Sequence, residues 1–130
     1  MKEYSILNKV INKMKEEYDY TKQYTVYSAI VDKKGVIISL GRNSFVKTHT
    51  QQYYYNQKSH PDKIFLHAEI DSLLKYKTDN GYVMIVCRMT KSGLIKLAKP
   101  CEGCMRAIVD SGIKKVYYTN NEGELVLMRI

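Results

Sequence analysis

The sequence contains the stretch Pro100-Cys101-Glu102-Gly103-Cys104, which begins a segment with apolar residues at helical spacing. Proline is favoured in the first turn of a helix and Gly112 provides a C-terminal cap, so we expect a helix from near Pro100 to Gly112. Because Cys101 and Cys104 are three positions apart, both lie on one face of its first turn. The positive end of the helix dipole favours thiolates there, and the thiolate is the form that binds metal ions.

A second motif, His67-Ala68-Glu69, lies at the start of another segment with a helical apolar face. Together with the two cysteines, His67 makes a donor set of two thiolates and one imidazole, which suits Zn²⁺. Three protein ligands leave a fourth position for water, as in catalytic rather than structural zinc sites. Zinc lowers the pKa of bound water from about 15.7 towards about 7, and Glu69 is placed to move protons.

Each motif residue also has a simpler interpretation. A Cys-x-x-Cys pair is typical of thioredoxin-like redox proteins, but those need no upstream His-x-Glu. An isolated histidine is most simply a packed core residue, whereas the two cysteines favour His67 as a metal ligand. Cys87 lies in an apolar segment and is most simply a small buried hydrophobe, so we exclude it from the metal site. An odd number of cysteines without an export signal argues against a disulfide framework.

The rest of the chain predicts one further helix and five strands, from apolar periodicity and from runs of β-branched and aromatic residues. The element order is α-β-β-α-β-α-β-β, which predicts a three-layer α/β/α domain with a mixed five-stranded sheet and a C-terminal β-hairpin. We expect residues 1–130 to form a single domain. The predicted segments are the helix Ile6–Tyr18, the hairpin strands Tyr24–Val31 and Val36–Leu40, the central strand Tyr82–Met89, and the closing strands Val116–Thr119 and Leu125–Ile130.

The segment Gly41–Pro61 is polar and has no clear period, so we interpret it as a loop on the substrate side. It contains three consecutive tyrosines, Tyr53–Tyr55. These rings could stack on the bases of a single-stranded nucleic acid, with Lys47, Lys58 and Lys63 nearby. The alternative is that the loop packs its own aromatic side chains against the domain.

The chain of 130 residues carries 21 Lys and Arg against 13 Asp and Glu, a net charge of +8. The basic excess is concentrated between residues 75 and 115, which favours anionic ligands. Arg42 and Arg106 are candidates to bind a phosphate. However, scattered basic residues are also typical of a solvated surface, so charge alone does not identify the partner.

The longest apolar run, near Tyr82–Cys87, is far shorter than the roughly 20 residues of a membrane-spanning helix. The N-terminal residues are charged and amphipathic and show no secretory signal. We therefore expect a cytoplasmic protein with no membrane association.

The pairing of His-x-Glu with Pro-Cys-x-x-Cys resembles the zinc-dependent cytidine and deoxycytidylate deaminase superfamily. The resemblance extends over essentially the whole chain and looks closest to the nucleotide-type branch, through His67–Ile70 and Lys99–Tyr118. It implies a cytidine-deaminase-like fold. Some nucleotide- and tRNA-acting relatives insert a helix before a parallel last strand, but the turn Asn120–Gly123 leaves no room for one. We therefore expect the last two strands to be antiparallel.

The resemblance implies a role for each motif residue. His67, Cys101 and Cys104 would bind zinc, and the zinc-bound hydroxide would attack C4, the carbon that bears the exocyclic amine. Glu69 would take a proton from the water and deliver protons to the ring nitrogen and to the departing ammonia. The substrate contacts would be Asn43 on the base and sugar, and the Ala68 N–H and the Pro100 carbonyl at the pyrimidine edge.

Three functions remain open at the level of the sequence. The leading hypothesis is hydrolytic deamination of a free cytosine nucleotide or nucleoside, above all deoxycytidylate or cytidylate. The second is an editing deaminase acting on cytosine or adenine in single-stranded DNA or RNA, because the same site serves flipped bases and the chain is basic. The third is a zinc-stabilised binding protein without turnover, although such a protein needs no Glu69. The resemblance also implies association into homo-oligomers.

Overall fold

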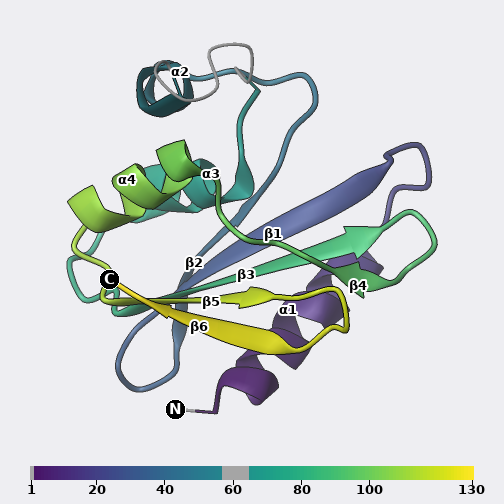
Figure 1. Cartoon of the computed structure of the whole chain (residues 1–130), viewed down its shortest axis with the longest axis horizontal. Helices are drawn as coiled ribbons and strands as arrows, with labels where there is room; N and C mark the ends of the chain where they lie inside the picture. The colour runs from purple at the N-terminus through teal and green to yellow at the C-terminus, as the bar shows by residue number, and fades with distance from the viewer. Residues whose placement is uncertain (1, 57–64) are drawn as a thin grey trace.

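The computed structural model describes residues 2–56 and 65–130 of the chain. A sheet of six strands forms its centre, in the order β2-β1-β3-β5-β6, with β4 paired to β3 outside this path (Figure 1). The elements are α1 (Glu3–Glu16), β1 (Tyr24–Val31), β2 (Ile37–Arg42), α2 (Thr50–Asn56), α3 (Ala68–Lys75), β3 (Val83–Thr90), β4 (Ile95–Lys96), α4 (Glu102–Asp110), β5 (Lys115–Thr119) and β6 (Leu125–Arg129).

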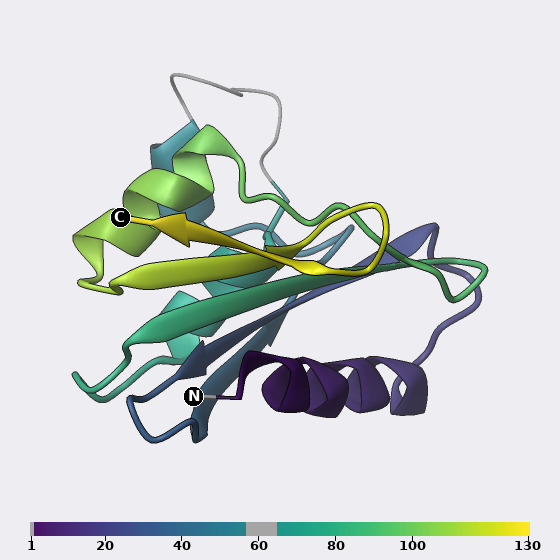
Figure 2. The same cartoon turned by 60° about the horizontal axis from the view of Figure 1, so that its bottom comes forward.

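Helices cover both faces of the sheet. Helix α1 lies on one face, and α3 and α4 lie on the other (Figure 2). Successive residues of a strand point to opposite faces, so β1 and β3 contribute alternate side chains to two separate cores. Val10 and Met14 of α1 pack in the first core with Ile85 of β3, and Ile108 of α4 packs in the second core with Met84. The predicted three-layer α/β/α architecture is thereby confirmed.

The sheet is mixed, as expected. Strand β3 is antiparallel to β1 and parallel to β5, and α4 forms the crossover between the two parallel strands. Strands β5 and β6 are antiparallel partners, which confirms the predicted C-terminal hairpin.

Two elements differ from the sequence prediction. Strand β4 has two residues and makes the sheet six-stranded rather than five-stranded, because a tight turn at Gly93, with a φ of 87°, folds the chain back on β3. Helix α2 forms inside the segment predicted as a loop. It begins after His49, whose Nδ1 accepts a hydrogen bond from the Gln51 N–H at 3.0 Å. A helix this short and polar shows no apolar period in the sequence.

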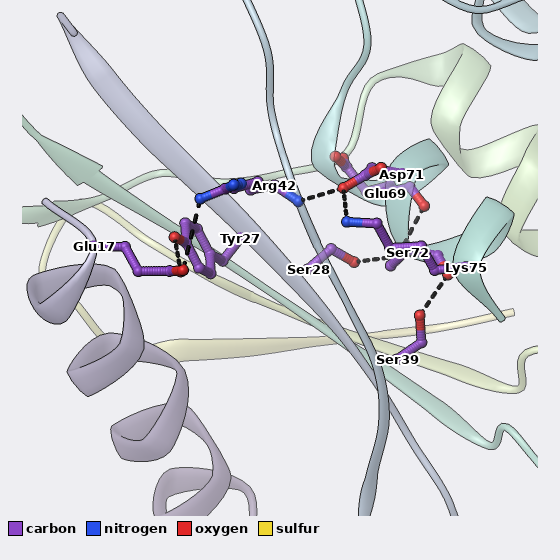
Figure 3. A network of polar contacts seen from close by, with 9 residues as sticks. All are labelled: Glu17, Tyr27, Ser28, Ser39, Arg42, Glu69, Asp71, Ser72 and Lys75. Carbon is purple, nitrogen blue, oxygen red and sulfur yellow. Dashed lines mark hydrogen bonds and ion pairs between the residues drawn. The ribbon is translucent and has the colours of Figure 1, made fainter. Parts of the chain in front are cut away.

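A network of polar contacts connects α3 to the sheet (Figure 3). Ser72 Oγ donates to the Glu69 carbonyl at 2.9 Å and lies 3.0 Å from Ser28 Oγ of β1, and both serines are fully buried. Ser39 Oγ of β2 donates to the Ser72 carbonyl at 2.7 Å. These contacts fix the first turns of α3 against β1 and β2.

The outer part of this network reaches α1. The Arg42 N–H donates to Asp71 of α3 at 3.0 Å, and the Arg42 guanidinium lies 3.7 Å from the Glu17 carboxylate. Tyr27 also donates a hydrogen bond to Glu17. The network therefore runs from the end of α1, across β1 and β2, to α3 on the opposite face of the sheet (Figure 3).

Strand β2 and helix α3 are in close backbone contact at Gly41. A Cβ atom at this position would lie 2.3 Å from the Ser72 nitrogen and 2.5 Å from the Ala68 carbonyl oxygen. Both contacts are with backbone atoms, which cannot move aside without displacing the helix. Glycine therefore sets the distance between β2 and the start of α3.

Among the residues that the structure describes, no helix combines the length and the apolar character needed to cross a membrane.

The buried serine pair predicts a non-additive pair of substitutions. Ser72→Ala leaves the Ser28 hydroxyl buried without its partner, so we expect a loss of about 1–3 kcal/mol in the free energy of unfolding. Adding Ser28→Ala to that variant should cost less than Ser28→Ala costs in the original protein. Urea denaturation of the four proteins measures this coupling, and strictly additive losses would contradict the assignment.

Candidate active site

Three side chains of types that can bind a metal ion meet at the N-termini of α3 and α4. His67 is the residue before α3, Cys101 is the residue before α4, and Cys104 lies in the first turn of α4. The His67 Nδ1 lies 3.3 Å from the Cys104 Sγ and 3.7 Å from the Cys101 Sγ. The three donor atoms all lie within 4.8 Å of one another. The structure thus brings together the donor set that the two sequence motifs predict.

The spacing of these donors fits a tetrahedral zinc ion. With a Zn–N distance of about 2.0 Å and a Zn–S distance of about 2.3 Å, tetrahedral angles place nitrogen and sulfur about 3.5 Å apart. The two N···S separations, 3.3 and 3.7 Å, lie on either side of this value. One imidazole and two thiolates are also ligands that zinc prefers. Cys87 is buried elsewhere and does not belong to this group.

The two cysteines of the group differ in their acidity. Hydrogen bonding to Cys104, and secondly to His67, lowers the pKa of the half-buried Cys101 thiol to about 3, although burial opposes this shift. The Cys104 backbone N–H also donates to the Cys101 sulfur, at 3.5 Å, as the N-cap contact of α4. The pKa of Cys104 is raised well above its usual value, first by hydrogen bonding to Cys101 and then by burial. Cys101 is therefore a thiolate at neutral pH before any metal binds.

Glu69 lies in the first turn of α3 beside the donor set, with 5% of its surface exposed. Burial raises the pKa of its carboxyl group to about 7, although the charge of His67 opposes this shift. A carboxyl group with a pKa near neutrality can both accept and donate a proton at pH 7. It is not a member of the group of metal donors. Glu69 can therefore serve as an acid and a base next to the metal site.

Two members of the donor set, His67 and Cys101, line a cavity of about 330 Å³. This volume lies at the lower end of the range of small-molecule sites, about 300–1,000 Å³. The residues that line the cavity are Tyr24, Val26, Asn43, His67, Ala68, Glu69, Arg88, Leu97, Ala98, Lys99 and Cys101.

The predicted substrate contacts lie at or beside this cavity. Asn43 is fixed to β1, because its N–H donates to the Val26 carbonyl at 3.0 Å and its Oδ1 accepts from the Val26 N–H at 2.8 Å. This leaves the Asn43 side-chain NH₂ group available to a ligand. Ala68 lines the cavity, and Pro100 is buried between two lining residues, Lys99 and Cys101.

The segment that carries Cys101 is fastened to the end of β5. The Ala98 N–H donates to the Thr119 carbonyl at 2.9 Å, and the Thr119 Oγ1 donates to the Lys96 carbonyl at 2.7 Å. At the other side of α4, a Cβ atom on Gly103 would lie 2.1 Å from the Asn56 Oδ1 and 2.7 Å from the Tyr55 carbonyl oxygen. The glycine between the two cysteines therefore allows α2 to pack against the first turn of α4.

Gln52 of α2 supports the donor set, a role that no sequence pattern indicates. It is fully buried, and its Oε1 accepts the His67 N–H at 2.8 Å. Gln52 also lowers the pKa of the nearby Cys104 thiol. Among the described residues, its buried Nε2 has no hydrogen-bond partner. Gln52 therefore holds the backbone of His67, the residue before α3 that carries one of the three candidate metal donors.

Other candidates from the sequence lie outside the cavity. Arg42 pairs with Glu17, and Arg106 lies 3.6 Å from Glu102 and donates to the Tyr55 carbonyl, so both arginines have partners. The hydroxyl of Tyr55 donates to Asp110 of α4 at 2.8 Å. Tyr53 and Tyr54 are 51% and 66% exposed, and neither lines the cavity. Lys58 and Lys63 lie outside the described residues.

A comparison with protein families finds one relevant match. The family model described as "Cytidine and deoxycytidylate deaminase zinc-binding region" matches residues 1–120. A search of curated proteins finds no match. The family match and the His67, Cys101 and Cys104 group together support Zn²⁺ as the cofactor, as the sequence predicts.

Gln52 gives a prediction for metal affinity. Gln52→Leu removes the acceptor of the His67 N–H, which holds His67 in place, so we expect zinc affinity to fall about 10–100-fold. Gln51→Leu, at the exposed neighbouring position on α2, is the matched control. Competition with a chromophoric chelator measures both affinities, and circular dichroism checks that both variants fold. Equal affinities in the two variants would contradict the supporting role of Gln52.

The thiol pKa values predict an order of reactivity. In zinc-free protein at pH 7, iodoacetamide should label Cys101 first, because its pKa is lowered to about 3. Cys87 should stay unlabelled until the protein unfolds, because burial raises its pKa to about 12. Zinc should protect Cys101. Peptide mass spectrometry over time tests this, and equal labelling of Cys87 and Cys101 in the folded protein would refute it.

Proposed function

Because the chain belongs to the cytidine and deoxycytidylate deaminase family, we propose that it hydrolytically removes the amino group of a free cytosine nucleotide or nucleoside. The products are the corresponding uracil compound and ammonia. The observation that carries this proposal is Glu69, a buried carboxyl group that lines a small cavity together with His67 and Cys101 of the donor set and does not itself belong to that set.

In this proposal His67, Cys101 and Cys104 hold the zinc ion. Bound zinc lowers the pKa of a water ligand and so supplies the nucleophile for C4 of the base. Three protein donors would leave one position of a tetrahedral zinc ion open for water, and two of these donors, His67 and Cys101, line the cavity. The helix N-termini of α3 and α4 favour the negative charge that the two thiolates bring to this donor set.

Glu69 moves the protons. Hydrolysis of the amine moves two protons. One passes from the attacking water to the ring nitrogen N3, and the proton of the resulting C4 hydroxyl group passes to the leaving amine as the C4–N bond breaks and the carbonyl forms. A single carboxyl group with a pKa of about 7 can perform these transfers in turn, because it exchanges protons readily at neutral pH. Burial, which raises this pKa, also keeps bulk water away from the carboxyl group.

Asn43, Ala68 and Pro100 orient the substrate in this proposal. The free NH₂ group of Asn43 donates to the base or sugar, since its Oδ1 already accepts from β1. The N–H of Ala68 belongs to the first turn of α3, where backbone amides have no acceptor inside the helix. The carbonyl of Pro100, next to Cys101, accepts from the amino edge of the pyrimidine. We also propose that residues 1–130 act as one domain, because both cores share a single sheet.

An editing deaminase that acts on single-stranded nucleic acid is the second candidate. The exposed rings of Tyr53 and Tyr54 favour it, because aromatic side chains on a surface can stack on bases. The small cavity volume of about 330 Å³ favours a free nucleotide or nucleoside instead. A zinc protein without turnover is the least supported candidate, because it would not need a buried carboxyl group beside the metal.

Glu69→Gln separates metal binding from catalysis. The substitution keeps the shape of the side chain and leaves the metal donors intact, so zinc content should stay near one ion per chain. Loss of the proton carrier should reduce deamination about 10²–10⁴-fold. Metal analysis gives the first quantity. Mass-spectrometric detection of the amine-to-carbonyl change in cytidine, deoxycytidine and their monophosphates gives the second.

Glu122→Gln, at an exposed glutamate in the β5–β6 turn, is the matched control and should keep full activity. Wild-type activity in Glu69→Gln would contradict the assigned role. Failure of the zinc-loaded original protein to deaminate any compound of the panel would contradict the proposed function. Turnover of cytosine in single-stranded oligonucleotides alone would favour the editing deaminase.

A further inference from the structure

Arg88 is a charged residue on a strand face that is otherwise apolar. In β3, Met84 and Val86 point to the core beneath α4, and the next position on the same face is Arg88. This core ends where the cavity begins, and Arg88 lines the cavity. The sequence shows the same feature as one charged residue within an apolar run, although its purpose is visible only in the structure.

An aromatic ring fixes the Arg88 side chain. The guanidinium carbon lies 5.1 Å from the centroid of the Tyr24 ring, which also lines the cavity. Phe45 contacts Tyr24 edge-on, with the ring centroids 5.1 Å apart and an angle of 76° between the planes. A cation–π contact of this kind restrains the guanidinium beside the ring at the cavity.

Lys99 is the second cation of the cavity. It precedes Pro100 and Cys101 in the segment that is fastened to β5, so its side chain originates beside the metal donors. Among residues 2–56 and 65–130, neither Arg88 nor Lys99 forms an ion pair. Arg42 and Arg106, by contrast, are paired with Glu17 and Glu102. The cavity therefore presents two cations that no carboxylate of the described chain neutralises.

We propose that Arg88 and Lys99 form a phosphate subsite, so that the substrate is a cytosine nucleoside 5′-monophosphate rather than a nucleoside. This proposal rests on the proposed deamination, because the base must occupy the metal side of the cavity. The planar guanidinium of Arg88 binds two phosphate oxygens at once, and Lys99 adds a mobile point charge. Tyr24 contacts the sugar or the base between the two ends.

The size of the cavity favours a monoester over a polynucleotide. A single-strand groove follows several phosphates with a stripe of cations and stacks successive bases on aromatic rings. The cavity of about 330 Å³ has two cationic lining residues, Arg88 and Lys99. The exposed Tyr53 and Tyr54 do not line it. These features match one phosphate group and one base.

Binding of reaction products tests the subsite without turnover. We expect the zinc-loaded protein to bind dUMP at least 10-fold more tightly than deoxyuridine in isothermal titration calorimetry. Arg88→Gln should reduce this preference 10–100-fold and leave deoxyuridine binding unchanged. Arg88→Lys should keep part of the preference, because it retains the charge but loses the second hydrogen bond.

Lys96→Gln is the matched control. Lys96 is the partner of Arg88 in the β3–β4 register, but its Nζ donates to the Asn121 carbonyl at 3.2 Å, and it does not line the cavity. Lys96→Gln removes one positive charge from the same region as Arg88→Gln does. A general electrostatic effect on phosphate binding would therefore appear in both variants. A phosphate preference that survives Arg88→Gln, or that falls equally in Lys96→Gln, would overturn the proposal.

Turnover distinguishes this proposal from the proposed function. If dCMP and deoxycytidine are deaminated with equal kcat/KM, the deaminase function stands and the phosphate subsite is wrong. If neither is deaminated, the proposed function fails. In that case dUMP binding that depends on Arg88 still supports the subsite, and equal or absent binding of dUMP and deoxyuridine overturns it. Tighter binding of oligo-deoxycytidylate than of dCMP, independent of Arg88, also overturns it.

Discussion

The structure depends on the meeting of two helix N-termini on one face of the sheet. His67 and Cys101 are the N-cap residues of α3 and α4, and the His67 Nδ1 lies within 3.7 Å of both cysteine sulfurs. Without a metal ion, this arrangement places two thiol groups, an imidazole and a buried carboxyl group in contact. Their mutual influence is visible in opposite pKa shifts of Cys101 and Cys104. A bound divalent cation with affinity for sulfur and nitrogen would stabilise both cysteines as thiolates and so offset their mutual repulsion.

The rest of the fold fixes these two helix starts in place. Ser28 and Ser39 hold α3 on the sheet, and Gly41 allows the close approach. The crossover from β3 to β5 places α4 beside α3, and α2 packs across the first turn of α4 at Gly103. Gln52 joins α2 to the metal donors through the His67 N–H. The candidate metal site is thus held in place by β1 and β2 on one side and by α2 on the other.

Much of this arrangement could be predicted from the sequence. The sequence predicts these elements well because each buries one or both of its faces. The helices α1, α3 and α4 therefore show a clear apolar period, and the strands β1 and β3 show long runs of apolar residues. The donor set was found because its spacing is local within each motif and its residue types suit zinc. Helix α2 and strand β4 were missed, since a seven-residue polar helix and a two-residue strand depend on tertiary contacts. No sequence pattern indicates that Gln52 and Lys99 belong to the site, because only the folded chain brings them there. The expected homo-oligomer stays a prediction.

X-ray absorption at the zinc K-edge of the purified protein tests the central claim most directly. The account predicts one zinc ion per chain with two sulfur ligands at about 2.3 Å and two lighter ligands at about 2.0 Å, one imidazole nitrogen and one water oxygen. Loss of both sulfur ligands in Cys101→Ser/Cys104→Ser would identify their source. A shell of four protein ligands with no water, or a protein that folds and acts without zinc, would contradict an open metal site at the junction of α3 and α4.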